Sequence, residues 1–402
     1  MSRHRRAVSI AFLTFGAVAG TWIPRLPALK DHLHLSDGQI GYALVAYAVG
    51  GVLGAAIARM LLGRGARSSV RGGLIAICAA LVAPALAGNF AQLVGSIFLL
   101  GGCAGFIDLL VNAQAAEMER VAGRPLINRF HGFWSLGAIF GSVVAGGAAY
   151  TGVSPLLQFV FAAIVVAAAS APFLGDLPDT RSGGAHATPA GTGRLFLTGS
   201  VVAVAAIALC SILVQGGTSS WSPLYLREFS HANPGIAAGG FAGFALATTL
   251  VRFRADQLTA HTSPAVVARL GGLIAAFGLS LAIAVPALPG AITGFALVGI
   301  GTAAMVPLAF SAGANLGQSG TALTLVMASG YAGSIAGPAM IGYAADHVGL
   351  RVALGIPLAG ALVIVALGGA LRPGSARRRP ADEADNGLDP AVVVVDDQSL
   401  VG

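Results

Sequence analysis

A single carboxylate, Asp108, lies deep inside a long apolar run of the chain. The run from Leu93 to Val111 is otherwise apolar and long enough to enter a bilayer. Asn112 follows four residues later, on the same face of a helix. An ionised Asp at mid-helix costs about 2.5–3.5 kcal/mol, so it usually faces a cavity and marks a pathway for ions or solute. We predict that Asp108 carries protons; the alternative is a protonated Asp that hydrogen-bonds a neighbouring helix.

A second group of polar side chains interrupts the apolar run 195–222. Gln215, Thr218 and Ser220 are able to hydrogen-bond a hydroxylated ligand. They are equally able to bond a neighbouring helix or the preceding carbonyls of their own helix. Both interpretations stay open, and we name these three residues and Asn112 as candidate solute-binding residues.

Two more candidates lie near the start of the run 130–151. His131 has a side chain whose unperturbed pKa is close to physiological pH, so it is able to relay protons, or to pack at the membrane interface. Trp134 lies about one helical turn further in and is able to stack on a sugar ring. Both are predicted to contact solute.

Trp22 ends the first apolar run and is followed by Pro24, Arg25 and Pro27. Two prolines are expected to break the helix, and broken helices at membrane depth occur only beside a cavity or inside protein. Trp22 is therefore a candidate solute contact, with an interfacial aromatic belt as the alternative. Arg25 would either bind an anion at a cavity mouth or extend outward to water, and the prediction favours the second.

The composition indicates a membrane protein. Of the 402 residues, 56% are hydrophobic and 10% are charged, whereas a soluble domain has about 25% charged residues. Apolar windows of about 20 residues predict an all-α membrane protein with twelve transmembrane helices. The predicted spans are 7–29, 38–62, 71–88, 91–117, 130–151, 154–174, 195–222, 234–253, 265–286, 289–313, 321–344 and 351–371.

The basic residues predict the orientation of the chain in the membrane. With the N-terminus inside, the 23 Lys and Arg divide 19 inside to 4 outside. Basic residues are enriched in cytoplasmic loops, so both termini are expected in the cytoplasm. Basic clusters at alternate ends of apolar runs are a signal of topology, and we expect no nucleic-acid partner.

An internal repeat predicts how the spans are grouped. Trp22-Ile-Pro ends the first span, and Trp221-Ser-Pro ends the seventh. This spacing predicts two pseudo-symmetric six-helix halves, a parallel repeat of the kind found in transporters. The predicted divisions are an N-terminal half at 1–174, a cytoplasmic linker at 175–194, a C-terminal half at 195–371 and a disordered cytoplasmic tail at 372–402.

Three stretches of the chain carry a family resemblance. D-L-L-V-N (108–112) is similar to an acidic-x-x-x-Asn motif. I-N-R-F-H-G-F-W-S-L-G-A (127–138) places His131 and Trp134 where sugar-contacting side chains lie in the related pattern. R-F-R-A-D-Q-L (252–258) resembles a cytoplasmic loop signature. The chain resembles the major facilitator superfamily, and more narrowly its fucose-permease-like branch with uncharacterised bacterial inner-membrane relatives.

The resemblance implies a carrier that works by alternating access, in which two halves rock about a central site. We assign Arg64, Arg252 and Asp256 to gating or structure and not to solute binding, because a charged loop pair is able to stabilise one of the two states by differential contacts. Glycine pairs at i, i+4 spacing predict close helix packing. They are Gly50 with Gly54, Gly137 with Gly141, and Gly333 with Gly337.

The chain departs from the resembled pattern in the loop G-R-G-A-R (63–67), which lacks the acidic residue of the loop signature, and at three further positions. Ile23 stands where the sugar permeases have an Asp. Gln215 and Ser220 stand where the relatives often have Glu and Asp. Proton coupling would then depend on Asp108 alone.

These observations predict a secondary active transporter of the inner membrane. We do not expect an enzyme, because no nucleophile–base pair or metal-ligand cluster is apparent. We expect proton coupling and a sugar-like polar solute. The alternatives are proton-driven efflux of drug-like compounds and a non-transporting receptor or scaffold. No G-x-x-x-x-G-K-S/T loop is present, so we expect no ATP use and no cofactor or metal. The expected partners are a small solute, protons and the lipid bilayer, with the chain as a monomer.

Overall fold

The computed structural model describes residues 3–61, 65–122, 126–178, 198–316 and 321–371, without the side chains of Asn128 and of residues 255–261. Over these residues the chain forms helices joined by turns. The helices are α1 (Arg3–Trp22), η1 (Ile23–Arg25), α2 (Leu26–His32), α3 (Asp37–Leu61), α4 (Ala66–Ala80), η2 (Ala83–Leu86), α5 (Phe90–Ala122), α6 (Ile127–Tyr150), α7 (Pro155–Ser170), η3 (Ala171–Asp176), α8 (Gly199–Glu228), α9 (Pro234–Ala237), α10 (Gly239–His261), α11 (Pro264–Ala284), α12 (Leu288–Thr302), α13 (Met305–Asn315), α14 (Thr321–Val348), α15 (Leu350–Ala353), α16 (Gly355–Leu367) and η4 (Gly368–Leu371).

Twelve segments of the described chain are long and apolar enough to cross a membrane. This confirms the predicted all-α membrane fold. Helices extend past several predicted ends, since the first predicted span, 7–29, lies within the segment Arg3–His32. The segments are Arg3–His32, Asp37–Leu61, Ala66–Leu86, Phe90–Ala122, Arg129–Tyr150, Pro155–Asp176, Gly199–Glu228, Pro234–Arg254, Pro264–Ala284, Leu288–Asn315, Thr321–Val348 and Leu350–Leu371.

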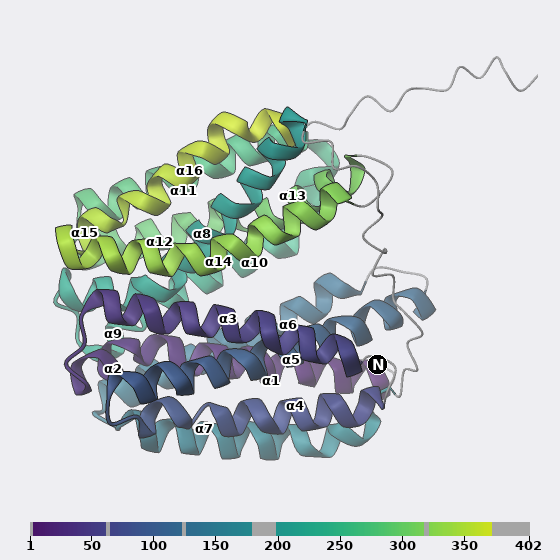
Figure 1. Ribbon diagram of the computed structural model, residues 1–402, viewed down its shortest axis with the longest axis vertical. Helices are drawn as coiled ribbons and strands as arrows, with labels where there is room; N and C mark the ends of the chain where they lie inside the picture. The colour runs from purple at the N-terminus through teal and green to yellow at the C-terminus, as the bar shows by residue number, and fades with distance from the viewer. Residues whose placement is uncertain (1–2, 62–64, 123–125, 179–197, 317–320, 372–402) are drawn as a thin grey trace, which may run out of the picture. The chain divides into compact units, whose positions relative to one another are not determined.

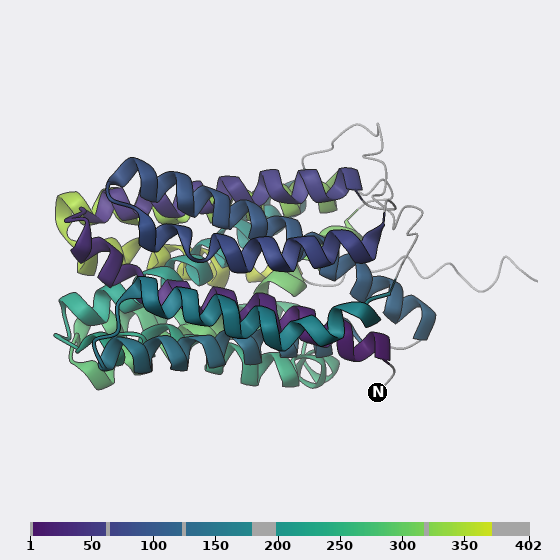
Figure 2. The same ribbon diagram turned by 90° about the horizontal axis from the view of Figure 1, so that it is seen from below.

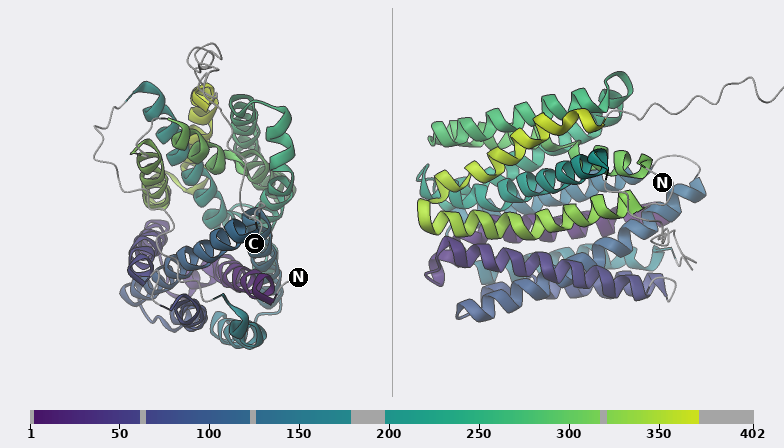
Figure 3. Two further views of the ribbon diagram at one scale, coloured as in Figure 1. Left: turned by 90° about the vertical axis from the view of Figure 1, so that its right-hand side faces the viewer. Right: turned by 45° about the horizontal axis from the view of Figure 1, so that its top comes forward.

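The twelve segments form two bundles of six. Helices α1 to α7 lie together in the lower part of Figure 1, and the longer helices from α8 to α16 lie together above them, while the short α9 lies at the level of the first bundle and packs against α6. Figure 2 shows that the helices run along a common direction, and the left view of Figure 3 looks along them. The predicted linker beyond residue 178 and the predicted tail 372–402 lie outside the described residues. The proposed domain boundaries therefore stay predictions.

We name the two ends of the bundle by the elements found there. The linker end is the end at which α1 and α8 begin. The far end is the opposite end, which holds α2, α9 and α15 (Figure 1).

The first span changes geometry at its two prolines, as predicted. α1 ends at Trp22, the 3₁₀ segment η1 carries Pro24, and α2 carries Pro27 near its start. Proline lacks the N–H that an α-helix interior uses, so the regular helix ends before it. Arg25 lies at this break, between η1 and α2.

Glycines allow three helix pairs to pack with their backbones in contact. A Cβ placed on Gly54 would collide with the backbone of Gly102. The backbones of α3 and α5 are therefore in contact there, with no room for a side chain between them. Likewise, Gly137 of α6 lies against the backbone of Leu13 in α1. Gly333 of α14 lies against the backbone of Leu209 in α8. The predicted close packing of the glycine pairs is confirmed at these contacts, because small residues let membrane helices approach closely.

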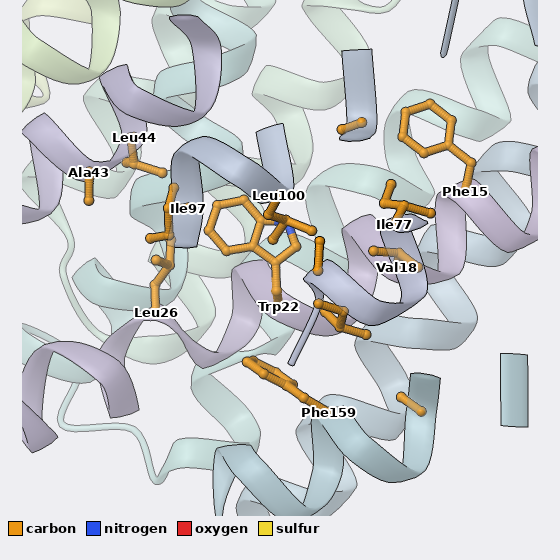
Figure 4. Packing of buried hydrophobic residues seen from close by; sticks show 14 of the residues in the cluster. Phe15, Val18, Trp22, Leu26, Ala43, Leu44, Ile77, Ile97, Leu100 and Phe159 are labelled. Carbon is orange, nitrogen blue, oxygen red and sulfur yellow. The ribbon is translucent and has the colours of Figure 1, made fainter. Parts of the chain in front are cut away.

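The core of the first half surrounds Trp22. Its side chain is 2% exposed and packs among aliphatic residues of several helices. Figure 4 shows the indole beside Leu100 of α5, with Ile97 and Phe159 nearby. The packing of the Trp22 side chain fixes the end of α1 against α5, the helix that carries Asp108.

Candidate functional site

Asp108 is exposed although it lies near the middle of the apolar helix α5. Its neighbour Ile107 is buried, and so is Leu110. The Asn112 side-chain nitrogen donates to Asp108 Oδ1 over 3.0 Å and to the Asp108 carbonyl oxygen over 2.9 Å. The shared helix face predicted from their spacing is therefore a direct contact.

His131 joins this pair from the next helix. Its Nε2 lies 3.1 Å from Asn112 Oδ1, so with Nε2 protonated it donates to the amide oxygen. The imidazole also packs edge-on against Phe12 of α1, with ring centroids 5.3 Å apart. Asp108, Asn112 and His131 thus form one hydrogen-bonded chain across α5 and α6.

A carboxylate of α5 ties the start of α6 in place. Glu119 Oε2 accepts from the backbone nitrogens of Leu126 and Ile127, over 2.7 and 2.9 Å. A carboxylate at a helix N-terminus satisfies free N–H groups and favours the helix dipole. The contact fixes the first turn of α6 on α5, and His131 follows one turn later.

Two tyrosines that the sequence analysis did not select lie near Asp108. Tyr47 of α3 and Tyr331 of α14 are both within electrostatic range of the carboxylate. Tyr331 belongs to the second half and is exposed, whereas Tyr47 lies against Trp22, with ring centroids 5.1 Å apart. No local pattern pointed to them, because each reaches Asp108 from a distant part of the chain.

The second half contributes Gln215 and Arg252. Gln215 Nε2 donates to the Thr302 carbonyl over 3.2 Å. Arg252 Nη2 donates to Gln215 Oε1 over 3.3 Å, and its Nε donates to the Ala303 carbonyl over 3.4 Å. These bonds hold both side chains between α8, α10 and α12.

Arg252 faces the first half. Its charge acts on His131, and a Cβ on the neighbouring Gly132 would meet the ring of Phe253 at 2.7 Å. We call Asp108, Asn112, His131, Gln215 and Arg252 the polar cluster. Arg252 was predicted to act in gating or structure, and that role stays a prediction; its guanidinium donates to Gln215, a predicted solute-binding residue.

Thr218 and Ser220 lie further along α8 and differ from each other. Thr218 is fully buried and its hydroxyl has no hydrogen-bond partner. Ser220 is half-buried. The next residues also carry unpartnered buried groups, at Trp221 Nε1 and Ser222 Oγ. Their assignment as solute-binding residues stays a prediction.

The two tryptophans selected from the sequence are parts of the packing around α1. Trp22 lies in the core described above. Trp134 is half-buried and meets Phe15 edge-on, with ring centroids 6.1 Å apart, while its backbone lies against Gly16. Among the described contacts, neither ring joins the polar cluster directly, and their role as solute contacts stays a prediction.

The preferred prediction for Arg25 is wrong. Its side chain is 4% exposed and does not extend to water. Nη2 donates to the Val153 carbonyl over 2.6 Å, while Nε and Nη1 are buried without a partner. The sequence rule fails because outward extension needs a free path to water, and the packing of η1 closes that path.

Two predicted gating residues cannot be placed. Arg64 lies outside the described residues. The backbone of Asp256 belongs to α10, but its side chain lies outside the described part of the chain. Their gating roles stay predictions.

The two halves meet closely at the far end. Asp346 of α14 accepts from Ser36 Oγ over 2.9 Å and from the Gly38 backbone nitrogen over 2.8 Å. A Cβ on Gly342 would lie 2.8 Å from the Cα of Gly41, so α14 and α3 touch through their backbones. The far end is therefore closed by contacts between the halves.

The family assignment rests on a match over most of the chain. The sequence model of the Major Facilitator Superfamily matches residues 8–317. The chain belongs to the Major Facilitator Superfamily. As a member of this superfamily it is a secondary transporter that moves a small solute across a membrane, and it is not an enzyme.

A relative and two solved structures agree with this assignment. An uncharacterized transporter of Sinorhizobium fredii is 33% identical over 352 residues, covering 86% of this chain and 92% of the relative. The crystal structure of the nucleoside transporter NupG superposes with a TM-score of 0.70 at 14% identity, covering 92% of this chain and 98% of that chain. The E. coli fucose:proton symporter superposes with a TM-score of 0.60 at 16% identity, covering 91% and 98%. At these identities the structures show the shared fold, and membership of the fucose-permease-like branch stays a prediction.

Proposed function

We propose that this chain is a proton-coupled carrier of a small hydroxylated solute, with Asp108 as the proton-binding group. In this proposal the chain lies in the inner membrane as a monomer, and the linker end and both termini face the cytoplasm. The 19 to 4 division of basic residues supports this orientation.

The observation that carries the proposal is the hydrogen-bonded chain from Asp108 through Asn112 to His131. It places two titratable groups on neighbouring helices with one amide between them. A carboxylate in a membrane helix usually marks a path for ions or solute. The neighbouring side chains do not seal Asp108, as a proton-binding group of this kind requires.

The location of the cluster also supports transport. Transporter sites lie near the bilayer midplane at the interface of the repeats. Tyr331 and Arg252 of the second half approach Asp108 and His131 of the first half. A solute held between them would be released when the halves separate.

Amide, imidazole and phenol groups around the cluster favour a solute with hydroxyl groups, because each of them forms hydrogen bonds with hydroxyls. A sugar-like compound meets this requirement. Efflux of apolar drug-like compounds is the competing function, and a receptor that no longer transports is the third.

One experiment separates these functions. The protein is reconstituted into vesicles and offered labelled sugars, sugar acids and cationic drugs, with and without an imposed proton gradient. The proposal expects accumulation of a hydroxylated solute that a protonophore abolishes. Drug movement alone indicates efflux, and no movement of any compound under either condition indicates a receptor.

A further inference from the structure

Arg25 is a buried cation whose hydrogen-bonding capacity is largely unused. A guanidinium carries five N–H donors, and here only Nη2 has a partner, the Val153 carbonyl. Nε and Nη1 are buried and unpartnered. Burying an ion without a counter-charge is costly, and a single neutral carbonyl does not compensate a full positive charge.

Two acidic side chains of the far end are engaged elsewhere, and two others, Asp31 and Glu228, are exposed, whereas Arg25 is buried. Asp37 pairs with Lys30 over 2.6 Å, and Asp346 accepts from Ser36 and Gly38. Glu228 lies within electrostatic range of Asp37 and Lys30. In the part of the chain that the structure describes, the ion pairs are Lys30–Asp37 and Glu117–Arg120, and neither includes Arg25.

The position of Arg25 links it to the opening of the far end. η1 packs against α6 of the first half and against α8 and α10 of the second. The halves must separate there during alternating access, and that movement removes part of the cover over η1. The unpartnered N–H groups would then face the solution on the far side.

We infer that Arg25 is an anion-binding site at the far end of the transporter. A planar guanidinium binds oxyanions such as carboxylates through paired N–H groups. The anion is either a carboxylate of the solute or a free anion of the medium. The inference rests on the proposed function only for the opening of the far end, since binding itself is measurable without transport.

If the anion is part of the solute, charge alone couples binding of the solute to protonation of Asp108. An ionised Asp108 and an anionic solute in the same site repel each other, which favours entry of the solute together with a proton. Arg25 would receive the acid group first, at the far end.

The test uses the thermal stability of the purified full-length protein. Chloride, sulfate, acetate and glucuronate are titrated as sodium salts against the parent, Arg25→Met and Arg25→Lys, with glucose as the neutral counterpart of glucuronate. A ligand that binds the folded state raises the melting temperature in a saturable way. Arg351→Met is the matched control, because Arg351 is another far-end arginine that donates to backbone carbonyls, at Ile283 and Ala284.

We expect at least one anion to give a saturable rise in the parent and in Arg351→Met. The rise should be absent in Arg25→Met and at least tenfold weaker in apparent affinity in Arg25→Lys. If only the carboxylates raise the melting temperature, the anion is a carboxylate of the solute. If chloride also raises it, the anion is a free anion of the medium. The inference is overturned if none of the four salts gives a saturable rise in the parent, or if Arg25→Met responds like the parent. Neither result depends on transport, so a failure here differs from a failure of the proposed function.

Discussion

The carboxylate of Asp346 in α14 lies 2.8 Å from the backbone nitrogen of Gly38 in α3, across the two halves of the molecule. Gly38 is in the first turn of α3, where backbone N–H groups lack partners within the helix. The favourable interaction of a carboxylate with a helix N-terminus is thereby made between halves. It is available only while the far end is closed.

Removing this carboxylate should favour the open far end. Asp346→Ala deletes two hydrogen bonds to a charged group, each worth about 1.5–3 kcal/mol. We expect faster labelling of a single cysteine placed at Ala345, which is 6% exposed in this structure, by an impermeant reagent applied from the far side. Asp31→Ala removes an exposed acid of the same end and should leave the labelling rate unchanged. Equal labelling rates in Asp346→Ala and the parent would show that the hydrogen bonds of Asp346 do not keep the far end closed.

A side chain at Gly342 should prevent the far end from closing. A Cβ there would lie 2.8 Å from the Cα of Gly41 and 2.9 Å from the Asp37 carbonyl oxygen, so the helices must move apart. Gly342→Ala is expected to slow solute exchange at least tenfold while solute still binds from the far side. Gly355→Ala is the control, because a Cβ at Gly355 meets nothing within 4 Å. Normal exchange in Gly342→Ala would contradict close contact of α3 and α14 in the transport cycle.

Asn112 should be needed to connect Asp108 to His131. Asn112→Leu keeps the size of the side chain and removes its hydrogen bonds to both neighbours. We expect proton-driven uptake to fall at least tenfold with normal amounts of folded protein. Asn315→Leu is the matched control, because Asn315 also donates to the carbonyl four residues earlier but lies exposed at the end of α13. Unchanged uptake in Asn112→Leu would rule out this chain as the proton route.

The orientation of the chain is testable at its surface. Cysteines introduced one at a time at Ser182 in the linker and at His34 of the far end should react from opposite sides of the membrane. An impermeant reagent on intact cells is expected to label the cysteine at position 34 and to leave the one at 182 unlabelled. The reverse pattern would invert the proposed orientation.

The helical architecture was predictable because apolar runs and glycine spacing are local signals. A run of about 20 apolar residues has few alternatives to a membrane helix, since every backbone polar group must be paired in lipid. The Asp108–Asn112 contact was also predictable from a local signal, because residues four apart on a helix lie on the same face.

Contacts between distant segments were not predictable from these signals. The Asp346–Gly38 contact joins residues 308 apart in sequence, and nothing in either stretch indicates the other. The burial of Arg25 depends on how η1 is covered by α6, α8 and α10, which a local rule about long basic side chains does not include. Tyr331 comes within electrostatic range of Asp108 for a similar reason, through packing of the second half on the first.

The central claim is that Asp108 carries the proton that drives transport. Asp108→Asn keeps the shape of the side chain and its ability to hydrogen-bond, and removes its titration. The decisive measurement compares two activities of the same vesicles, namely accumulation of solute under a proton gradient and exchange of labelled for unlabelled solute without one. We predict that Asp108→Asn loses accumulation and retains exchange. Accumulation equal to that of the parent would contradict the claim and make Asp108 a structural residue.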